Sequence, residues 1–293
     1  MTDLHRSLIV THHAPDLDAC GAVWLLKRFA PELYANAAVT FVDAGEVLTE
    51  SQAVDLGFTM EHVIHVDTGQ GKFDHHQPEK ALLPLSACLL VFEDLSLHAP
   101  HLQADSALRQ LVEFITQIDH FGEVSWPDAG NFRYGYMMHE LLSGYEHLQL
   151  RDDDSQLEFA HTMLDSAYAQ QTQLLKAAEV LAEKGVEFEI QSGKAIAVET
   201  GNDEVLRLGQ KQGFVLVVKK DPKEGYIRIK ARPDSDIDLR SLHTAILAAD
   251  TQGTWYYHFS GKMLLNSSRK SARHAPSSLS LAQVVTLIKQ LYG

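Results

Sequence analysis

The sequence predicts an α/β protein, in which a first domain with a parallel, Rossmann-like sheet precedes a smaller α+β domain. Apolar runs of strand length alternate with helical patterns over the first 120 residues. A long helical pattern and several shorter strand-like runs follow. We place the boundary at the end of the long helix, which gives domains of 1–185 and 186–293.

Three short apolar runs in the first domain predict buried strands, at Ser7–Thr11, Val39–Asp43 and His62–Val66. Apolar residues recur at helical spacing over Asp18–Phe29 and Asp105–Phe121. Strands that alternate with helices are typical of parallel βαβ units. Because ligands of such sheets bind beyond the carboxyl ends of the strands, the polar residues that follow each run are candidates for a site.

A long helix is predicted over Gln156–Lys184, where Gly185 is a typical helix stop. The second domain is predicted to contain four strands and two helices, at Val186–Gln191, Ala195–Glu199, Phe214–Lys219, Tyr226–Arg232, Ser241–Ala249 and Ser280–Leu291. The last two strands flank DPKEG, a favourable hairpin turn.

Composition and charge limit the class of protein. The 293 residues contain two cysteines, Cys20 and Cys88, without disulfide or metal-binding spacing, so we expect a reducing, cytoplasmic setting. No run reaches the ~18 apolar residues of a membrane span, and the N-terminus lacks the features of a signal peptide.

The net charge of −14 is uneven: residues 190–293 carry a balance of +6, and residues 1–189 one of −20. One interpretation is an acidic half that binds cations and a basic half that binds the anionic part of a substrate. The other is chance combined with solvated helix faces.

The stretch THHAPDLDACGA at positions 11–22 holds the first group of candidate ligands. His12, Asp16 and Asp18 follow the first predicted strand and approach the start of the next helix. A helix N-cap explains either aspartate alone. A histidine and two aspartates around one tight turn also fit a metal site, and both interpretations stay open on this stretch alone.

The stretch HVDTGQGKFDHHQ at positions 65–77 holds the second group. Asp67 lies at a predicted strand end, and Asp74, His75 and His76 follow a turn with two glycines. Imidazole and carboxylate ligands together suit first-row divalent metals. No cysteine is nearby in the sequence, which argues against a structural zinc site.

These motifs resemble the DHH phosphoesterase superfamily, which includes RecJ-type exonucleases, nanoRNases, cyclic-dinucleotide phosphodiesterases and family II pyrophosphatases. The matching residues are the H-x3-D-x-D motif of His12, Asp16 and Asp18, the strand-end Asp67, the triplet Asp74-His75-His76, and Asp119 after an apolar helix. Asp67 and Asp74 are seven residues apart. This compact spacing resembles a branch that includes eukaryotic proteins with nuclease activity.

The resemblance implies a two-metal site in which Asp67 is shared. The implied ligands are His12, Asp16 and Asp67 for one divalent cation, and Asp18, Asp67, His75 and Asp119 for the other. The resemblance leaves His76 to contact the phosphate or the developing oxyanion, and Asp74 to orient a ligand histidine. Mixed His/Asp ligation favours Mn²⁺, with Mg²⁺ and Co²⁺ as alternatives.

Many members of the superfamily contact the substrate with a G-G-H-x-x-A-G-type loop of a C-terminal domain, which WYYHFSGKMLLNSSRK at 255–270 resembles loosely. Hydroxyl, amide and cationic groups near this stretch suit phosphate. The predicted substrate-binding residues are Arg232, His258, Ser260, Gly261, Lys262, Asn266 and Arg269. Tyr256 or Tyr257 would stack on a base. A surface hairpin with packed aromatic residues is the alternative.

Together these features predict a metal-dependent phosphohydrolase, of the phosphodiesterase or exonuclease kind, that acts on short single-stranded nucleic acid or nucleotide phosphodiesters. The alternatives are another phosphoryl substrate, such as a cyclic dinucleotide or pyrophosphate, and a metal-dependent binding protein without turnover. The small second domain disfavours a grip on long duplex DNA. No membrane partner is expected, and the oligomeric state is left open, with a homodimer as one option.

Overall fold

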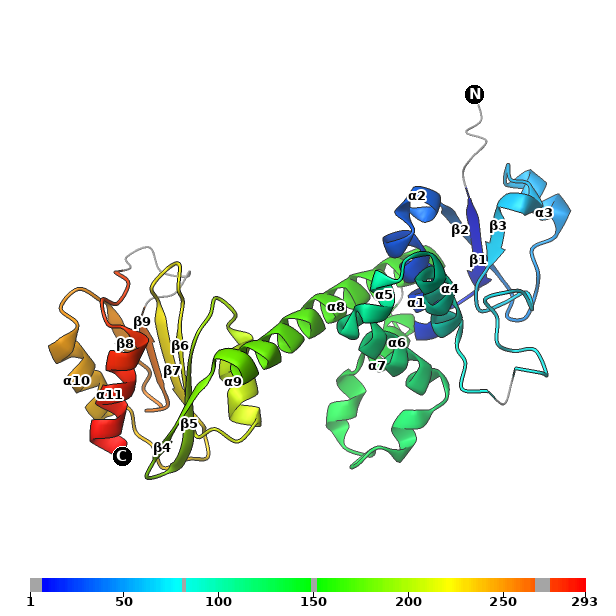
Figure 1. Ribbon diagram of the computed structural model, residues 1–293. Helices are drawn as coiled ribbons and strands as arrows, with labels where there is room; N and C mark the ends of the chain where they lie inside the picture. Colours follow the sequence, from blue (N-terminus) through cyan, green and yellow to red (C-terminus); the bar gives the residue numbers. More distant parts are fainter. Residues whose placement is uncertain (1–6, 81–82, 149–151, 267–274) are drawn as a thin grey trace. The chain divides into compact units, whose positions relative to one another are not determined.

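The computed structural model describes residues 7–80, 83–148, 152–266 and 275–293, and the chain forms two compact units, Met1–Gln170 and Gln171–Gly293. The division falls within the long helix α8 (Asp153–Lys184) (Figure 1). The predicted helix ends where expected, directly before Gly185. The domain boundary at residue 185 stays a prediction and coincides with the end of α8.

The first unit contains a three-stranded, all-parallel sheet with the strand order β2-β1-β3. Its strands are β1 (Leu8–His12), β2 (Ala38–Val42) and β3 (Val63–His65). Each overlaps one of the predicted strands, so the parallel α/β fold of this unit is confirmed.

Besides the first part of α8, the described residues of the first unit contain seven helices. They are α1 (Leu17–Phe29), α2 (Pro31–Tyr34), α3 (Glu50–Asp55), α4 (Ala87–His98), α5 (His101–Ala104), α6 (Ser106–Asp119) and α7 (Met138–Glu146), with 3-10 turns η1 (Met60–His62), η2 (Gly122–Ser125) and η3 (Phe132–Tyr136). Of these helices, the sequence predicted α1 and α6.

The alternation of side chains along β1 divides the core of the first unit into two layers. Leu8 and Val10 pack with Leu48 and Ala53 on the side of α3. Ile9 packs on the opposite side, in the large cluster formed by α1, α4, α6 and the first half of α8. The sheet therefore lies between two apolar layers, and its carboxyl edge is left for polar residues.

The second unit contains a mixed six-stranded sheet with the order β4-β5-β6-β7-β9-β8. Its strands are β4 (Val186–Ile190), β5 (Gly193–Glu199), β6 (Leu216–Lys220), β7 (Ile227–Ala231), β8 (Trp255–Tyr257) and β9 (Met263–Asn266). Only β5 and β6 pair in parallel among the described strands of this sheet. Its further helices are α9 (Glu204–Lys211), α10 (Arg240–Ala249) and α11 (Leu281–Tyr292).

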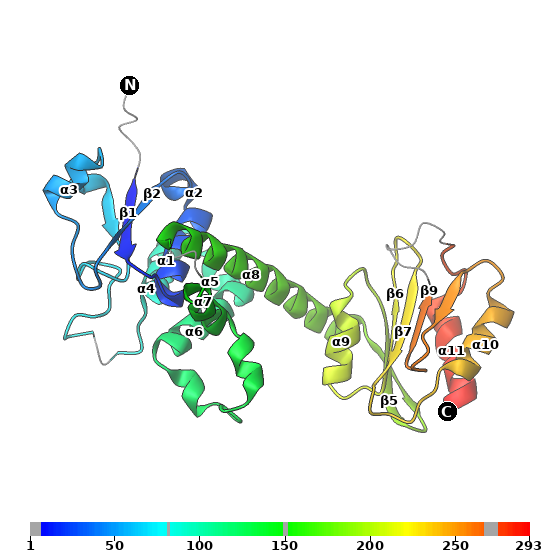
Figure 2. The same cartoon turned by 180° about the vertical axis from the view of Figure 1, so that it is seen from behind.

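Helices cover both faces of this second sheet (Figures 1 and 2). α10 and α11 pack on one face, where Ile246 and Ile288 join the core. α9 and the end of α8 pack on the other, where Leu181 and Leu206 are buried. The α+β prediction for this region is confirmed, and the predicted strands and helices match β4–β7, α10 and α11.

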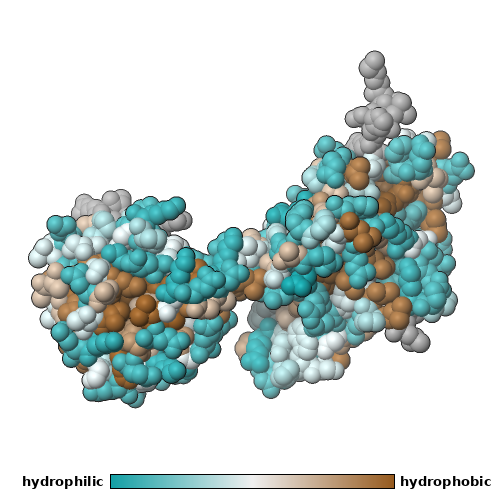
Figure 3. Space-filling view, in the orientation of Figure 1, coloured by the Kyte–Doolittle hydropathy of each residue, from teal (hydrophilic) through white to brown (hydrophobic). Residues whose placement is uncertain are grey.

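Hydrophilic residues cover much of each unit in the face that Figure 3 displays, with smaller apolar patches between them. Among the described residues, no helix combines the length and apolarity that a membrane-spanning helix requires.

A buried carboxylate organises the loops of the second unit. Asp250 directly follows α10 and is 3% exposed. Its oxygens accept hydrogen bonds from Trp255 Nε1 (2.8 Å), Ser277 Oγ (2.6 Å) and Gly253 N (3.0 Å). Burial alone would raise the pKa of Asp250, but these hydrogen bonds lower it below its usual range. The charged form is therefore part of the folded state.

We expect Asp250→Ala to lower the free energy of unfolding by about 2–4 kcal/mol, because several donors to one buried charge lose their acceptor. Urea unfolding monitored by circular dichroism measures this change. A carboxyl group with a lowered pKa stabilises the fold above its unfolded pKa of about 3.9, so the contribution fades as the pH falls below that value. Asp234→Ala, which removes an exposed ion pair with Arg232, is the control and should leave the stability nearly unchanged. Equal losses in both variants would contradict this expectation.

Candidate metal centre

The carboxyl ends of β1 and β3 place the two predicted ligand groups together. His12 is the last residue of β1, and Asp67 follows β3 by two residues. The two strands are hydrogen-bonded neighbours, so their following loops share one edge of the sheet. His12 Nε2 and Asp67 Oδ2 lie 3.3 Å apart.

The structure shows that Asp16 is a helix N-cap and also places it beside two other predicted metal ligands. Its Oδ1 accepts hydrogen bonds from the backbone N–H groups of Asp18 (2.9 Å) and Ala19 (3.0 Å), which makes it the N-cap of α1. Its carboxylate also lies with the side chains of His12 and Asp67 in a group whose ligand atoms are within 4.8 Å of one another. One oxygen caps the helix, and the other is left for the site.

Asp18 contacts the N-terminus of a second helix, α4. Its side chain is 2% exposed, and its two oxygens accept hydrogen bonds from the backbone N–H groups of Ala87 (2.6 Å) and Cys88 (2.9 Å), at the start of α4. The positive end of the helix dipole stabilises such a charge. Asp18 is thus anchored toward α4, while its Oδ2 lies 3.7 Å from His75 Nε2.

Asp67 occupies the centre of the group. Its backbone has φ +54°, a left-handed conformation that is costly for a residue with a side chain. A hydrogen bond from its N–H to the carbonyl of Phe73 (2.9 Å) fixes the turn. In this conformation Oδ2 faces His12, and Oδ1 lies 3.4 Å from His75 Nε2. The two oxygens of one carboxylate therefore point at two different histidines.

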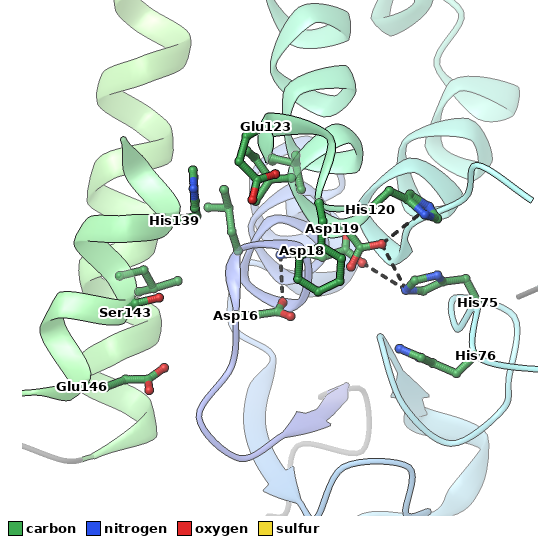
Figure 4. Close-up of a pocket in the computed structure, with 15 residues that line it drawn as sticks. Asp16, Asp18, His75, His76, Asp119, His120, Glu123, His139, Ser143 and Glu146 are labelled. Atoms are coloured by element: carbon green, nitrogen blue, oxygen red, sulfur yellow. Dashed lines mark hydrogen bonds and ion pairs between the residues drawn. The ribbon is translucent and has the colours of Figure 1, made fainter. Parts of the chain in front are cut away.

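Asp119 completes the group from the end of α6, of which it is the last residue. Its Oδ2 lies 3.6 Å from His75 Nε2, as the dashed lines of Figure 4 mark. The next residue, His120, brings a second imidazole near this carboxylate, with its Nε2 3.8 Å from Asp119 Oδ2. The sequence did not predict His120 as a site residue, although it adjoins Asp119.

Several atoms of this group are buried without a hydrogen-bond partner in the described part of the chain. They are Asp67 Oδ1, His75 Nε2 and Asp119 Oδ2. Because a buried polar atom without a partner costs free energy, such atoms point to a ligand. Imidazole nitrogen and carboxylate oxygen are donors that suit divalent first-row cations. The donor set therefore fits the metal site that the sequence resemblance implies.

The histidines compensate the carboxylate charge of Asp67. Burial alone would lower the pKa of His12, but its hydrogen bond with Asp67 and nearby carboxylate charges raise the pKa to about 9. The carboxylate of Asp67 likewise raises the pKa of His75 to about 9, against the effect of burial. Burial would raise the pKa of Asp67, but these histidines lower it. In the metal-free protein at pH 7, both imidazoles are therefore protonated.

The negative charges of the other carboxylates are balanced less well by nearby positive groups. Burial raises the pKa of Asp119 to about 6, and the charges of Asp67 and Asp16 act in the same direction, against the effect of His75. Burial and the charge of Asp67 also raise the pKa of Asp16 and of Asp18. These crowded carboxylates resist ionisation because their negative charges repel one another. A divalent cation would reduce this repulsion.

Asp74 organises the turn that carries the two histidines, but it orients His76 instead of the expected ligand histidine His75. Its Oδ1 lies 2.8 Å from His76 Nδ1, and its Oδ2 accepts a 2.6 Å hydrogen bond from the backbone of Gln70. The side chain of His76 is 62% exposed, and its Nδ1 lies 3.7 Å from Asp67 Oδ1. His76 is thus held beside the group with one face open to solvent.

A cavity of about 590 Å³ opens beside these residues. Figure 4 shows its opposite wall, where α7 presents His139, Ser143 and Glu146, and η2 presents Glu123. The sequence predicted none of these four. Glu123 follows Asp119 by four residues, whereas the three residues on α7 lie far from the motifs along the chain and reach the cavity only through the tertiary packing of α7.

The predicted substrate-binding residues belong to the second unit. His258, Ser260 and Gly261 form the turn between β8 and β9, in which His258 Nδ1 lies 2.8 Å from Ser260 Oγ. The backbone N–H of Gly261, at φ +73°, donates to the carbonyl of His258 (2.9 Å). Phe259 is 87% exposed at its tip. A hairpin is therefore present, as in the alternative interpretation of this stretch, but Phe259 is exposed and not packed into the core.

The remaining predicted residues differ in how their polar groups are used. Lys262 Nζ donates to the carbonyls of Ser235 and Ile237, and Arg232 pairs with Asp234. Asn266 is completely buried, and its side-chain amide bonds the backbone of neighbouring loops. Arg269 lies outside the described residues.

No protein-family model and no curated protein matches this chain. Solved structures that resemble it include RecJ from Thermus thermophilus in complex with Mn²⁺ (13% identity, TM-score 0.31) and an exonuclease RecJ bound to manganese (14%, 0.30). An exopolyphosphatase-related protein from Bacteroides fragilis resembles it at 15% identity, with a TM-score of 0.27.

Each of these likenesses covers 98% of this chain, which spans 52% of the Thermus RecJ chain and 90% and 91% of the other two. RecJ and the exopolyphosphatase-related protein are both members of the DHH superfamily, which the sequence motifs resemble. TM-scores of 0.27–0.31 are low, so the function is inferred from the residues of this chain.

We expect Asp119→Asn to stabilise the metal-free protein at pH 7 by about 1–2 kcal/mol, after allowance for solvent screening. A carboxyl group whose pKa rises on folding binds its proton more tightly in the folded state, so metal-free wild type loses stability as the pH rises from about 4 to 6. The Asp119→Asn variant has no carboxyl group at this position, so it should not lose this stability as the pH rises.

Thermal unfolding in EDTA between pH 4 and 7 measures both effects. Asp128→Asn, at an exposed aspartate, is the control. The expectation is wrong if Asp119→Asn unfolds at a lower temperature than wild type at pH 7 or keeps the wild-type dependence on pH.

Proposed function

We propose that this chain is a divalent-metal-dependent phosphohydrolase that cleaves phosphodiester bonds of short oligonucleotides or nucleotides. The observation that carries the proposal is the placement of Asp67, whose two oxygens face His12 and His75 separately. A carboxylate in this position is suited to bridge two cations.

The neighbours of His12 and His75 suggest which residues would bind each of the two cations. His12, Asp16 and Asp67 would hold one cation, since their ligand atoms lie within 4.8 Å of one another. The other would be held by the residues around His75 Nε2, which are Asp18, Asp67 and Asp119. When bound, a pair of cations supplies Lewis-acid activation of water and neutralises charge on the phosphoryl group. The mixture of imidazole and carboxylate favours Mn²⁺.

His76 is placed to act on the substrate. It is exposed, stands beside Asp67, and is oriented through Nδ1 by Asp74. With Nδ1–H donated to Asp74, the cationic form of the ring can donate from Nε2 to a phosphate oxygen or to the leaving group. Asp74 is a positioning residue in this proposal, because it acts through His76.

The wall of the cavity supports a phosphodiester over pyrophosphate. Glu123 and Glu146 add two carboxylates opposite the metal group. A diester carries one negative charge at phosphorus, whereas pyrophosphate brings several, which this wall would repel. Phe121 lines the same cavity and is 72% exposed, so it offers a ring on which a nucleobase could stack.

The second unit supports an anionic, base-containing ligand. Its residues from 190 to 293 carry a balance of +6. Tyr256 is 53% exposed beside the β8–β9 turn, where His258 and Ser260 provide polar groups. We retain Arg232, His258, Ser260, Gly261 and Lys262 as proposed phosphate contacts.

We expect Mn²⁺-dependent hydrolysis of labelled RNA or DNA of two to about twenty nucleotides, and little of pyrophosphate. Asp67→Ala should lower kcat/KM by about 10³-fold or more, because it removes the shared ligand. Asp128→Ala, at an exposed aspartate that belongs to no motif and does not line the cavity, is the control and should retain activity. Hydrolysis rates test this expectation on a panel of the labelled RNA and DNA, pyrophosphate, a cyclic dinucleotide and a base-free phosphodiester.

The outcome of that panel separates the alternatives. Turnover of pyrophosphate or a cyclic dinucleotide alone would replace the proposed substrate. Tight binding of Mn²⁺ without turnover of any compound would favour a metal-dependent binding protein.

We expect Phe121→Ala to raise the KM for a dinucleotide about tenfold, because stacking contributes ~1–3 kcal/mol per base. Phe121→Tyr keeps the ring and should retain the wild-type KM. Steady-state kinetics on a base-free phosphodiester is the control, since that substrate cannot stack. A parallel rise of KM for both substrates would argue against base stacking at this position.

A further inference from the structure

The first turn of α8 contacts the loop that carries His12 and Asp16. Asp153 and Gln156 are three residues apart on this helix, so their side chains share one face. Between them they bind the three loop residues that separate the two candidate ligands.

Asp153 uses both of its carboxylate oxygens. Its Oδ2 lies 2.6 Å from His13 Nδ1, and its Oδ1 accepts a 2.8 Å hydrogen bond from the backbone N–H of Ala14. Ala14 has φ +48°, a left-handed conformation that side chains disfavour. The hydrogen bond from Ala14 to Asp153 therefore holds a backbone conformation that local preference would not maintain.

Gln156 holds the next residue of the loop. Its side chain is buried, and its Nε2 donates to the carbonyl of Pro15 (3.0 Å). The same amide lies 3.2 Å from Glu146 Oε1, on the far wall of the cavity. One helix turn thus contacts both the ligand loop and the opposite wall.

His13 connects this turn to a candidate ligand. The backbone carbonyl of His13 lies 2.9 Å from Nδ1 of His12. When Nδ1–H donates to that carbonyl, the ring is oriented so that Nε2 faces Asp67, and Nε2 is the nitrogen that would bind a cation after losing its proton. A displacement of His13 would therefore turn the ring of His12 away from the shared carboxylate.

We propose that Asp153 and Gln156, here called the α8 clamp, are positioning residues of the metal centre. They fix the loop so that His12 and Asp16 converge on Asp67. The inference rests on the proposed function, since it concerns how the same site is assembled. Neither residue contacts the substrate, and both act through the loop.

Calorimetric titration of the full chain with Mn²⁺ tests the proposal directly. Asp153→Ala is expected to raise the Kd for Mn²⁺ about tenfold or more, as the loss of groups that orient ligands does. Gln156→Ala should raise it in the same direction. Asp153→Asn, whose carbonyl can still accept from Ala14, should recover part of the affinity.

A second readout needs neither metal nor activity. Hydrogen exchange of peptides that cover residues 11–19, measured in EDTA, should be faster in Asp153→Ala, because the N–H of Ala14 loses its acceptor. Unchanged exchange in these peptides would overturn the clamp.

Asp165 provides the matched control on the same helix. Its carboxylate accepts from Trp24 Nε1 (2.9 Å) and pairs with Arg28 (2.6 Å), which attaches α8 to α1. Asp165→Ala should lower the melting temperature but leave the Kd for Mn²⁺ unchanged. If it weakens Mn²⁺ binding as much as Asp153→Ala does, the clamp is only a structural contact.

The outcomes separate this inference from the proposed function. An unchanged Kd in Asp153→Ala overturns the clamp, while a wild type that binds Mn²⁺ and hydrolyses a phosphodiester upholds the function. A wild type that binds Mn²⁺ without hydrolysis, together with weakened binding in Asp153→Ala, upholds the clamp and overturns the function. A wild type that binds no Mn²⁺ overturns both.

Discussion

The concentration of carboxylates at one edge of a three-stranded sheet is the constraint on which the first unit depends. Four aspartates converge there, and their negative charges are balanced to different degrees. The N-termini of α1 and α4 hold Asp16 and Asp18. Asp67 lies against two histidines, and Asp119 remains undercompensated. The starts of two helices and the turns of two loops are therefore positioned by the same charges, which protein groups alone neutralise only in part.

In the first unit, the sequence predicted the three strands and the helices α1 and α6 because their patterns are local. Alternating apolar and polar residues, or a short apolar run followed by a polar turn, can be recognised within about five to ten residues. α4 escaped prediction because ACLLVFEDLSLH begins as an apolar run, which periodicity alone cannot assign to helix or strand. The N-terminus of α4 nevertheless binds Asp18, so the helix that the sequence did not predict is part of the site.

The motif residues of the metal group could be predicted, whereas the wall of the cavity could not. His12, Asp67 and His75 lie in short stretches with an unusual density of ligand types. His139 and Glu146 lie on α7, where isolated polar residues have no distinctive spacing. The two roles of Asp16 also required coordinates, because a cap and a ligand look identical in sequence and differ only in which oxygen is used.

The charges of the cavity also impose an order on binding. Asp16, Asp18 and Asp119 line it on one side, and Glu123 and Glu146 on the other. A phosphate anion would enter this space against repulsion unless cations had bound first. Protonated His12 and His75 offset part of the charge, but the cations that the site fits compete with those protons for the same nitrogens. On the proposed function, we therefore expect metal binding to precede substrate binding, and the carboxylates that remain unpaired would favour a substrate with a single negative charge at phosphorus.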